Sequence, residues 1–128
     1  MGEQQRPIVV VVDDEPAIVD VVCEVLVDAE VADASGCPHG HRAHLCIRRK
    51  RPALVILDVQ MPDVDGVEIF RQMRADPDTR TIPVIFCTAN AHKLVQWLPD
   101  YQALGAHLLP KPFDIGRLID VVERALAL

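Results

Sequence analysis

Five side chains that could bind a metal ion or act on a phosphoryl group each follow an apolar segment of this sequence. They are Asp13, Asp14, Asp58, Thr88 and Lys111. In an open parallel sheet, ligands bind beyond the carboxyl ends of the strands. We therefore expect the fold to bring three carboxylates, one hydroxyl and one ammonium group together from four different strands.

Three carboxylates at one place repel one another, and each raises the pKa of the others unless a cation lies among them. Oxygen ligands without a nearby His or Cys favour a hard divalent ion, Mg²⁺ or Mn²⁺, which could also bridge to a phosphoryl oxygen. Lys111 would add a positive charge for the same oxygens. One carboxylate could then act as a nucleophile, and Asp58 is favoured because it is the single acid that ends a central strand.

Each of these residues also has a simpler interpretation when it is taken alone. An Asp after a strand often forms a turn or caps a helix, Thr88 fits an ordinary β-turn, and Lys111 fits a solvated charge. It is the combination that favours a site. The Lys111-Pro112 bond supports it, because an X-Pro bond can adopt the cis form and a cis turn would aim Lys111 inward.

The elements that must position these side chains alternate between apolar runs and amphipathic stripes. Strands are expected at residues 8–12, 30–34 (a weak strand at a sheet edge), 53–57, 84–87 and 107–109. Helices are expected between them and after the last strand, where Asp114 can act as the N-cap. Such alternation, with right-handed crossovers, predicts an α/β three-layer sandwich in which helices cover both faces of a parallel sheet.

Composition narrows the classes of protein to consider. The 128 residues, 50% hydrophobic and 25% charged, fit a single domain over residues 1–128. A net charge of −6 opposes direct binding of nucleic acid. No apolar run approaches the ~20 residues of a membrane span, and the first residues lack the layout of a signal peptide, so we expect a cytoplasmic protein without membrane insertion.

The four cysteines, Cys23, Cys37, Cys46 and Cys87, lack the dense spacing of a disulfide scaffold, so reduced thiols are expected. Residues 37–46 hold two Cys and three His, a composition that raises a zinc hypothesis. Their spacing fits no standard zinc arrangement, however, and Cys46 could instead pack on the core side of a helix. The basic run at 48–51 is interpreted as complementing a helix C-terminus rather than as a nucleic-acid surface.

Four dispersed motifs now allow a comparison with a known family. They are VVVVDDEP at 9–16, LVILDVQMPDVDG at 54–66, FCTA at 86–89 and KPF at 111–113. In their order and near their spacing, the sequence resembles the receiver domain of bacterial two-component response regulators, including chemotaxis receivers, over essentially the whole chain. The resemblance implies a flavodoxin-like fold with five helices and five parallel strands in the order 2-1-3-4-5.

The resemblance also implies a function and a role for each site residue. Asp58 would accept a phosphoryl group from the phospho-His of a sensor histidine kinase or phosphotransfer protein, as part of a phosphorelay. Asp14, Asp58 and the backbone carbonyl of Gln60 would bind Mg²⁺ or Mn²⁺, with Asp13 acting through water. Thr88 and Lys111 would contact the phosphoryl group. The protein would then be a signalling switch that only phosphorylates and slowly dephosphorylates itself, not an enzyme in the usual sense.

In the family, phosphorylation shifts the face built from the fourth helix, fifth strand and fifth helix, where effector proteins dock and homodimers can form. Here Leu108 stands where the family has an aromatic switch residue, so aromatic gating is in doubt. The segment after Thr88 is longer than usual and contains Pro99, which predicts an irregular fourth helix. The aromatic side chains beside that proline, Trp97 and Tyr101, are expected to fill the core rather than a partner surface.

Other functions remain as alternatives. The loss of the aromatic switch would suit a receiver-like binding module that works without phosphorylation. A phosphotransferase with an Asp nucleophile would want a second carboxylate two residues after it, where Gln60 stands. A nucleotide-binding Rossmann domain is disfavoured because the first turn, DDEPA, lacks the glycines that pyrophosphate approach requires.

Overall fold

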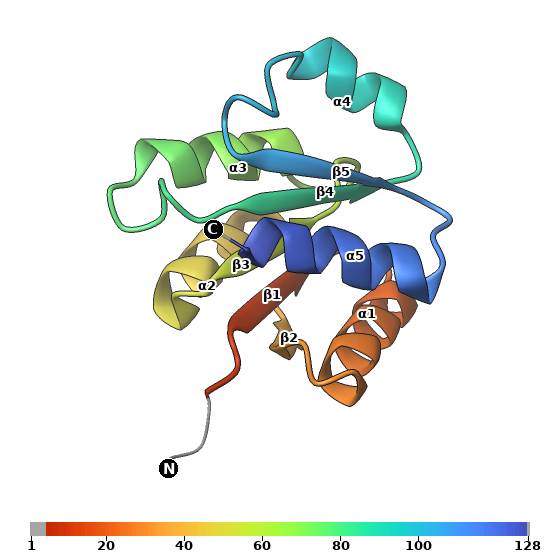
Figure 1. Ribbon diagram of the computed structural model, residues 1–128. Coiled ribbons are helices and arrows are strands. Elements are labelled where there is room, and N and C mark those ends of the chain that lie inside the picture. The colour runs from red at the N-terminus through yellow and green to blue at the C-terminus, as the bar shows by residue number, and fades with distance from the viewer. Residues whose placement is uncertain (1–4, 128) are drawn as a thin grey trace.

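The computed structural model describes residues 5–127, which form a parallel sheet between two layers of helices (Figure 1). The elements are β1 (Ile8–Val12), α1 (Pro16–Asp28), β2 (Asp33–Gly36), a short 3₁₀ turn (Gly40–Arg42), α2 (Ala43–Lys50), β3 (Leu54–Leu57), α3 (Gly66–Ala75), β4 (Val84–Thr88), α4 (Ala91–Trp97), β5 (Ala106–Pro110) and α5 (Ile115–Leu126). The strands pair in parallel in the order β2-β1-β3-β4-β5. The predicted flavodoxin-like α/β fold is confirmed.

The central strands are continuous apolar runs because both faces of the sheet are covered. Along β1, Val9 and Val11 pack with α1 and α5, whereas Val10 and Val12 pack on the opposite face with α2, α3 and α4. Figure 1 shows these two helical layers on either side of the sheet. Burial on both faces thus holds the sheet between the two helical layers. Polar residues can then stand at the strand ends, outside this core.

The edge strand β2 lies further along the chain than the sequence predicts. It covers Asp33–Gly36 instead of 30–34, and Glu30 lies before it in the left-handed region with φ 59°. The register Ile8↔Asp33 to Val11↔Gly36 pairs it with β1 through backbone hydrogen bonds. An edge strand exposed in this way does not need apolar side chains. Its sequence therefore lacks the apolar pattern from which strand bounds are predicted.

The predicted irregularity near Pro99 is confirmed, but the prediction for Trp97 is wrong. The helix α4 ends at Trp97, and turns follow as far as Gly105. The Trp97 side chain is 39% exposed, with the Lys93 ammonium 4.2 Å from its ring centroid. Tyr101 is partly buried against the core, as expected. Because α4 stops before the proline, Trp97 sits on the last turn of a short helix and does not reach the core.

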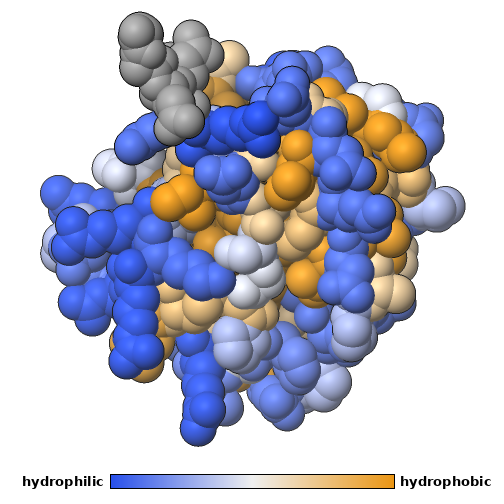
Figure 2. All heavy atoms as spheres, turned by 90° about the horizontal axis from the view of Figure 1, so that it is seen from below, coloured by the Kyte–Doolittle hydropathy of each residue, from blue (hydrophilic) through white to orange (hydrophobic). Residues whose placement is uncertain are grey.

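Apolar side chains on the helices are not all buried. Val21 of α1 and Ile115 of α5 are 48% and 59% exposed. Figure 2 shows hydrophobic residues interspersed with hydrophilic ones on the face seen from below.

Among residues 5–127, no helix is long and apolar enough to cross a membrane. Asp114 caps α5 as predicted, its carboxylate accepting the backbone N–H of Arg117 at 2.7 Å.

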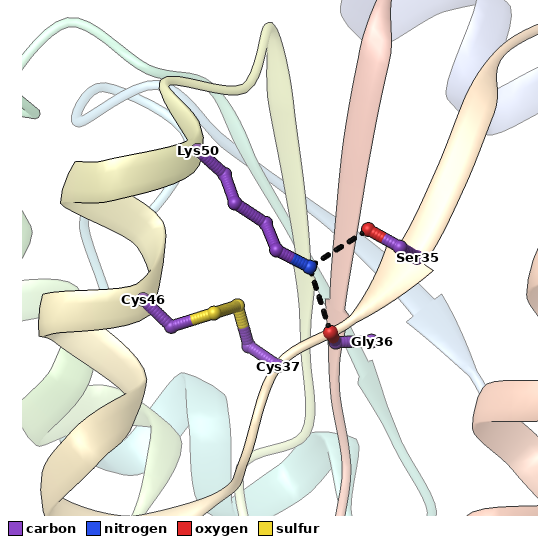
Figure 3. The surroundings of a disulfide bond; sticks show 5 residues. All are labelled: Ser35, Gly36, Cys37, Cys46 and Lys50. Atoms are coloured by element: carbon purple, nitrogen blue, oxygen red, sulfur yellow. Dashed lines mark hydrogen bonds between the residues drawn. A yellow bond between two sulfur atoms is a disulfide. The ribbon is translucent and has the colours of Figure 1, made fainter.

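The expectation of four reduced thiols is wrong for two of them. Cys37 directly follows β2 and forms a disulfide with Cys46 of α2, with the two Cα atoms 6.0 Å apart (Figure 3). Cys23 and Cys87 are free. The chain turns back between the two bonded residues, so a spacing of nine residues brings their side chains face to face. Both sulfurs are used in this bond, and the zinc hypothesis therefore loses its two thiolates.

The basic run at the end of α2 does more than complement the helix C-terminus. Lys50 Nζ donates to Ser35 Oγ at 2.9 Å and to the Gly36 carbonyl at 3.0 Å, which ties α2 to β2. Arg48 forms ion pairs with Asp76 and Asp78 beyond α3. Two of the four cations therefore hold neighbouring elements in place.

Substitution of Gly66 by Ala should destabilise the fold. A Cβ at this position would lie 1.9 Å from the backbone carbonyl oxygen of Asp58, which cannot move without displacing the end of β3. We expect a lower melting temperature, corresponding to a loss of about 1–3 kcal/mol or more. Gly116→Ala in α5 is the matched control, because its Cβ would meet only the Asp114 carboxylate at 3.5 Å. Equal melting temperatures of the two variants in thermal denaturation would contradict the close approach.

Candidate functional site

The sequence-predicted site residues meet at one edge of the sheet. Asp13 and Asp14 follow β1, Asp58 follows β3, Thr88 ends β4, and Lys111 follows β5. The register pairs Val12 with Leu57 and Thr88 with Pro110, so neighbouring strands end at the same level. Parallel pairing thus places side chains that are far apart in sequence on a single rim.

The three carboxylates lie close together and are mostly shielded from water. Asp13, Asp14 and Asp58 each present an oxygen within 4.8 Å of the others. Asp13 and Asp58 are 6% and 5% exposed, while Asp14 is partly buried. Within residues 5–127, this is the one group of at least three carboxylate, imidazole or thiol side chains close enough to share an ion.

Lys111 reaches into this group from the end of β5. Its Nζ lies 2.8 Å from Asp13 Oδ2, 3.3 Å from Glu15 Oε1 and 3.4 Å from Asp58 Oδ2. Burial alone would lower the pKa of the Lys111 ammonium, but the hydrogen bond to Asp13 and the charges of Asp58 and Asp13 outweigh it and raise that pKa. Lys111 therefore stays charged at neutral pH. Its bond with Pro112 is cis, the form that the sequence analysis associated with an inward-directed Lys111.

Asp58 occupies an environment that works against its ionised form. Burial, and next the negative charge of Asp13, raise the pKa of the Asp58 carboxyl above its usual value. Lys111 and the backbone N–H of Gln60, which donates to Asp58 Oδ1 at 3.3 Å, oppose this shift without cancelling it. The ionised carboxylate is thus incompletely compensated, which is the condition under which an added cation binds favourably.

Thr88 is fully buried at the end of β4 and is bonded on two sides. Its Oγ1 accepts the backbone N–H of Asn90 at 3.0 Å, and its carbonyl oxygen accepts the backbone N–H of Lys111 at 2.8 Å. An oxygen that accepts a hydrogen bond in this way still carries its own hydrogen for donation. Thr88 therefore links the ends of β4 and β5 and keeps a donor for a further acceptor.

Two contributors to the site were missed by the sequence analysis. Glu15 contacts Lys111, and the repeated acids of the DDE run could have suggested a third carboxylate there. Asn90 caps α4 by accepting the Lys93 N–H at 3.0 Å while donating to Thr88, and its position two residues after a strand-end Thr was the available signal. Gln60, predicted to use its carbonyl, lies in the loop after β3 with an exposed side chain.

The donor set of this site fits a divalent ion. It consists of carboxylate oxygens, which hard ions such as Mg²⁺ prefer, and it carries more negative charge than Lys111 neutralises. The same arrangement holds one carboxylate, that of Asp58, between an ammonium group and further acids. It can therefore bind a cation and present an oxygen nucleophile to an anionic phosphoryl group.

Comparisons with known proteins agree with this geometry. Residues 9–123 match the response regulator receiver domain family. The response regulator Rre1 of Synechocystis sp. is 33% identical over 116 residues, covering 91% of this chain and 50% of Rre1. The chain covers only 25% of the transcriptional regulator NtrC of Salmonella typhimurium, to which it is 32% identical over 123 residues, or 96% of the chain. It thus spans from a quarter to a half of the length of these two relatives.

A solved structure gives the same result. The chemotaxis response regulator CheY4 of Vibrio cholerae superposes with a TM-score of 0.80 at 27% identity, over 95% of this chain and 100% of that chain. The family match, over residues 9–123, includes the four strand ends that carry the site. The chain therefore belongs to the response regulator receiver domain family.

Proposed function

We propose that this chain is a phosphorylation-controlled switch of two-component signalling whose phosphoryl acceptor is Asp58. Membership of the receiver family makes it a component of such signalling rather than a classical enzyme. The observation that carries the finer proposal is the Asp58 carboxylate, buried at the end of β3 with Lys111 Nζ 3.4 Å from one of its oxygens. The donor would be the phospho-His of a sensor histidine kinase or of a phosphotransfer protein.

In the proposed reaction, a carboxylate oxygen of Asp58 attacks the phosphorus atom. The bond from phosphorus to the histidine nitrogen breaks, its electron pair stays with the imidazole, and an acyl phosphate forms on Asp58. Later attack by water on this acyl phosphate returns the carboxylate and releases inorganic phosphate. The chain would thus turn over only its own phosphoryl group.

Asp13, Asp14, Asp58 and the backbone carbonyl of Gln60 are the proposed holders of Mg²⁺ or Mn²⁺, with Asp13 acting through water. The receiver domain of the sensor histidine kinase PA1611 from Pseudomonas aeruginosa, which shares this fold, is described with a magnesium ion coordinated in its active-site cleft. When bound, the ion would supply positive charge to the oxygens of the transferring group. The excess of carboxylates over ammonium groups at this rim supports that assignment.

Lys111 and Thr88 are the proposed contacts of the phosphoryl group. Lys111 is already charged and held at the mouth of the site by Asp13, so it needs only a small movement to meet a new anion. Thr88 keeps a hydroxyl hydrogen that a phosphoryl oxygen could accept. Because the Thr88 carbonyl is bonded to the Lys111 N–H, a pull on either side chain would be felt at the ends of both β4 and β5.

The proposed output surface is the face of α4, β5 and α5, where an effector protein or a second copy of the chain would dock. Leu108 lies in the middle of β5, opposite Phe86 of β4 and two residues after the start of the strand. Its side chain is partly buried, and it cannot reproduce the rotation of an aromatic ring. We therefore expect phosphorylation to act through the β4 and β5 ends themselves.

Leu108 in place of an aromatic residue also supports the alternative of a binding module that works without phosphorylation. Partner affinity that stays the same after phosphorylation would favour this alternative. Turnover of external phosphate esters would instead indicate a phosphotransferase with Asp58 as its nucleophile. Both outcomes can be read from the same purified protein, with and without a phosphodonor.

Incubation with acetyl phosphate and Mg²⁺ should add one phosphoryl group to the wild-type chain. Asp58→Asn should add none, because an amide oxygen is too weak a nucleophile. The control, Asp100→Asn, removes an exposed acid from the turn after α4 and should label like the wild type. Intact-mass spectrometry measures all three, and labelling of the Asp58 variant would overturn the assignment.

Addition of Mg²⁺ should raise the melting temperature of the wild-type protein, because a ligand that binds only the folded state stabilises it. At a hundredfold excess over its dissociation constant the gain is about 2.7 kcal/mol. Asp14→Asn should lose most of this rise, whereas Asp100→Asn should keep it. Thermal denaturation across a Mg²⁺ titration tests this, and an undiminished rise in the Asp14 variant would count against its role as a ligand.

In metal-free protein, Asp58→Asn should raise the melting temperature at neutral pH by a few degrees. The raised pKa of the Asp58 carboxyl means that its ionised form destabilises the folded state. Wild-type stability should fall as pH rises from the unfolded pKa, roughly 3.9, through the higher folded pKa. The difference between the proteins should therefore vanish below about pH 4. Lys111 retains Asp13 in the variant, so a melting temperature below wild type at neutral pH would contradict the shift.

A further inference from the structure

A surface cavity lies beside the disulfide, away from the acidic site. Its volume is about 580 Å³, and it is lined by Pro38, Arg42, Leu45, Cys46, Arg49 and Lys50. Figure 3 shows that the disulfide joins α2 to the segment that follows β2. Lys50 extends from the same helix toward β2. Cys46, one of the two cysteines of the disulfide, thus lines the cavity together with three basic residues.

The cavity belongs to a positively charged part of a negatively charged chain. Between Asp33 and Asp58 the sequence contains no acid, yet it holds five of the thirteen Lys and Arg residues of the chain, all within 42–51. Lys50 is directed at Ser35 and Gly36. Arg42 and Arg49 are exposed and form no ion pair with any residue of the described range 5–127. They are available to an external anion.

The two bonded cysteines differ in accessibility. Cys46 is partly buried and lines the cavity, whereas Cys37 is only 7% exposed and does not. The Cys37 backbone is also held in place, because its N–H donates to the Val11 carbonyl at 3.0 Å. Of the two bonded cysteines, only Cys46 therefore borders the cavity from which a nucleophile would approach.

We propose that the Cys37–Cys46 disulfide is exchangeable and that Cys46 is the site at which an anionic low-molecular-weight thiol attacks it. The thiolate of that compound attacks Cys46 Sγ, the bond between the two protein sulfurs breaks, and Cys37 leaves as a thiolate that takes up a proton. A mixed disulfide then joins the small molecule to Cys46. A second thiolate can attack the sulfur of the small molecule, which releases Cys46 as a thiolate and the small molecule as its own disulfide.

The lining of the cavity explains the preference for an anionic compound. Arg42, Arg49 and Lys50 attract carboxylate or sulfonate groups on the incoming thiol and stabilise the negative charge that is shared among three sulfurs during exchange. Pro38 and Leu45, the latter 50% exposed, provide an apolar wall for its carbon chain. A neutral thiol would gain only the apolar contacts with Pro38 and Leu45.

The other two cysteines do not compete for this chemistry. Burial, and next the charge of Asp20, raise the pKa of the Cys23 thiol, and burial raises the pKa of Cys87 to about 12. The thiolate is the reactive form in exchange, so both remain largely unreactive at neutral pH. Adducts should therefore be confined to the pair that is bonded.

The first experiment compares the rates at which two thiols reduce the disulfide of the oxidised full chain. The probes are 2-mercaptoethanesulfonate, which is anionic, and 2-mercaptoethanol, which is neutral, used at equal thiolate concentration. We expect the anionic thiol to react about fivefold faster at low salt, since one close opposite charge contributes a factor of this order. The rate is followed by alkylating the released thiols and measuring their mass.

The advantage of the anionic thiol should disappear in the double variant Arg42→Gln, Arg49→Gln and should shrink at high salt. The matched control is Arg117→Gln, Arg124→Gln, which removes two charges from α5 and should keep the wild-type ratio. Equal rates for the two thiols in the wild-type chain would overturn the proposal. So would protein that still contains four free thiols after oxidation, because the proposed bond would then not form.

A second measurement locates the reactive sulfur without depending on the intact disulfide. With oxidised glutathione, Cys37→Ser should form one mixed disulfide at Cys46, and Cys46→Ser should form none because Cys37 is buried. Peptide mapping identifies the modified residue. An adduct on Cys37, or on neither variant, would contradict the assignment, and the wild-type rate comparison stands even if a variant folds poorly.

Discussion

The structure depends on holding like charges together at the edge of the sheet. Three carboxylates lie within 4.8 Å of one another, and a single ammonium group, that of Lys111, bridges two of them and Glu15. Its closest bond, to Asp13, joins residues 98 positions apart. Such a cluster persists only because the surrounding core is apolar on both faces of the sheet and holds every strand end in place. The remaining excess of negative charge is the basis for the proposal that the site holds a cation, which would in turn offset the charge of an incoming phosphoryl group.

The same rim connects the chemistry to the rest of the molecule through short backbone links. The Thr88 carbonyl accepts the backbone N–H of Lys111, so the residues that carry the hydroxyl and the ammonium group are joined through their backbones at the ends of β4 and β5. On the other side of the site, the start of α3 approaches the Asp58 carbonyl so closely that only glycine fits at position 66. Asp58 therefore has backbone on one side and the polar side chains of Thr88 and Lys111 on the other. The proposed switch would use this asymmetry, with its effect directed toward β4 and β5.

Charge is distributed unevenly over the protein, with an acidic region at the strand ends and a basic region at α2. The acids gather at the strand ends, while the cations of α2 gather near a disulfide that the acids do not touch. Some of these cations are structural, since Arg48 and Lys50 bind α2 to its neighbours. Others, Arg42 and Arg49, are exposed beside Cys46, where we propose that they attract an anionic thiol. The separation of the two regions would keep the proposed cation site and the proposed anion-binding cavity from neutralising each other.

The sequence alone determined the fold class, the strand order implied by its motifs, and the five predicted residues at the rim. It could do so because the buried central strands are long apolar runs, and the polar residues that follow them mark the strand ends. It misplaced β2, since an edge strand is held by backbone pairing and carries little side-chain signal, and it misjudged Trp97, whose exposure depends on where α4 stops. Only the tertiary structure decided that Glu15 contacts Lys111, that Asp58 is the incompletely compensated carboxylate, and that Cys37 meets Cys46. Those outcomes are set by distances between elements, which local patterns of residue types do not encode.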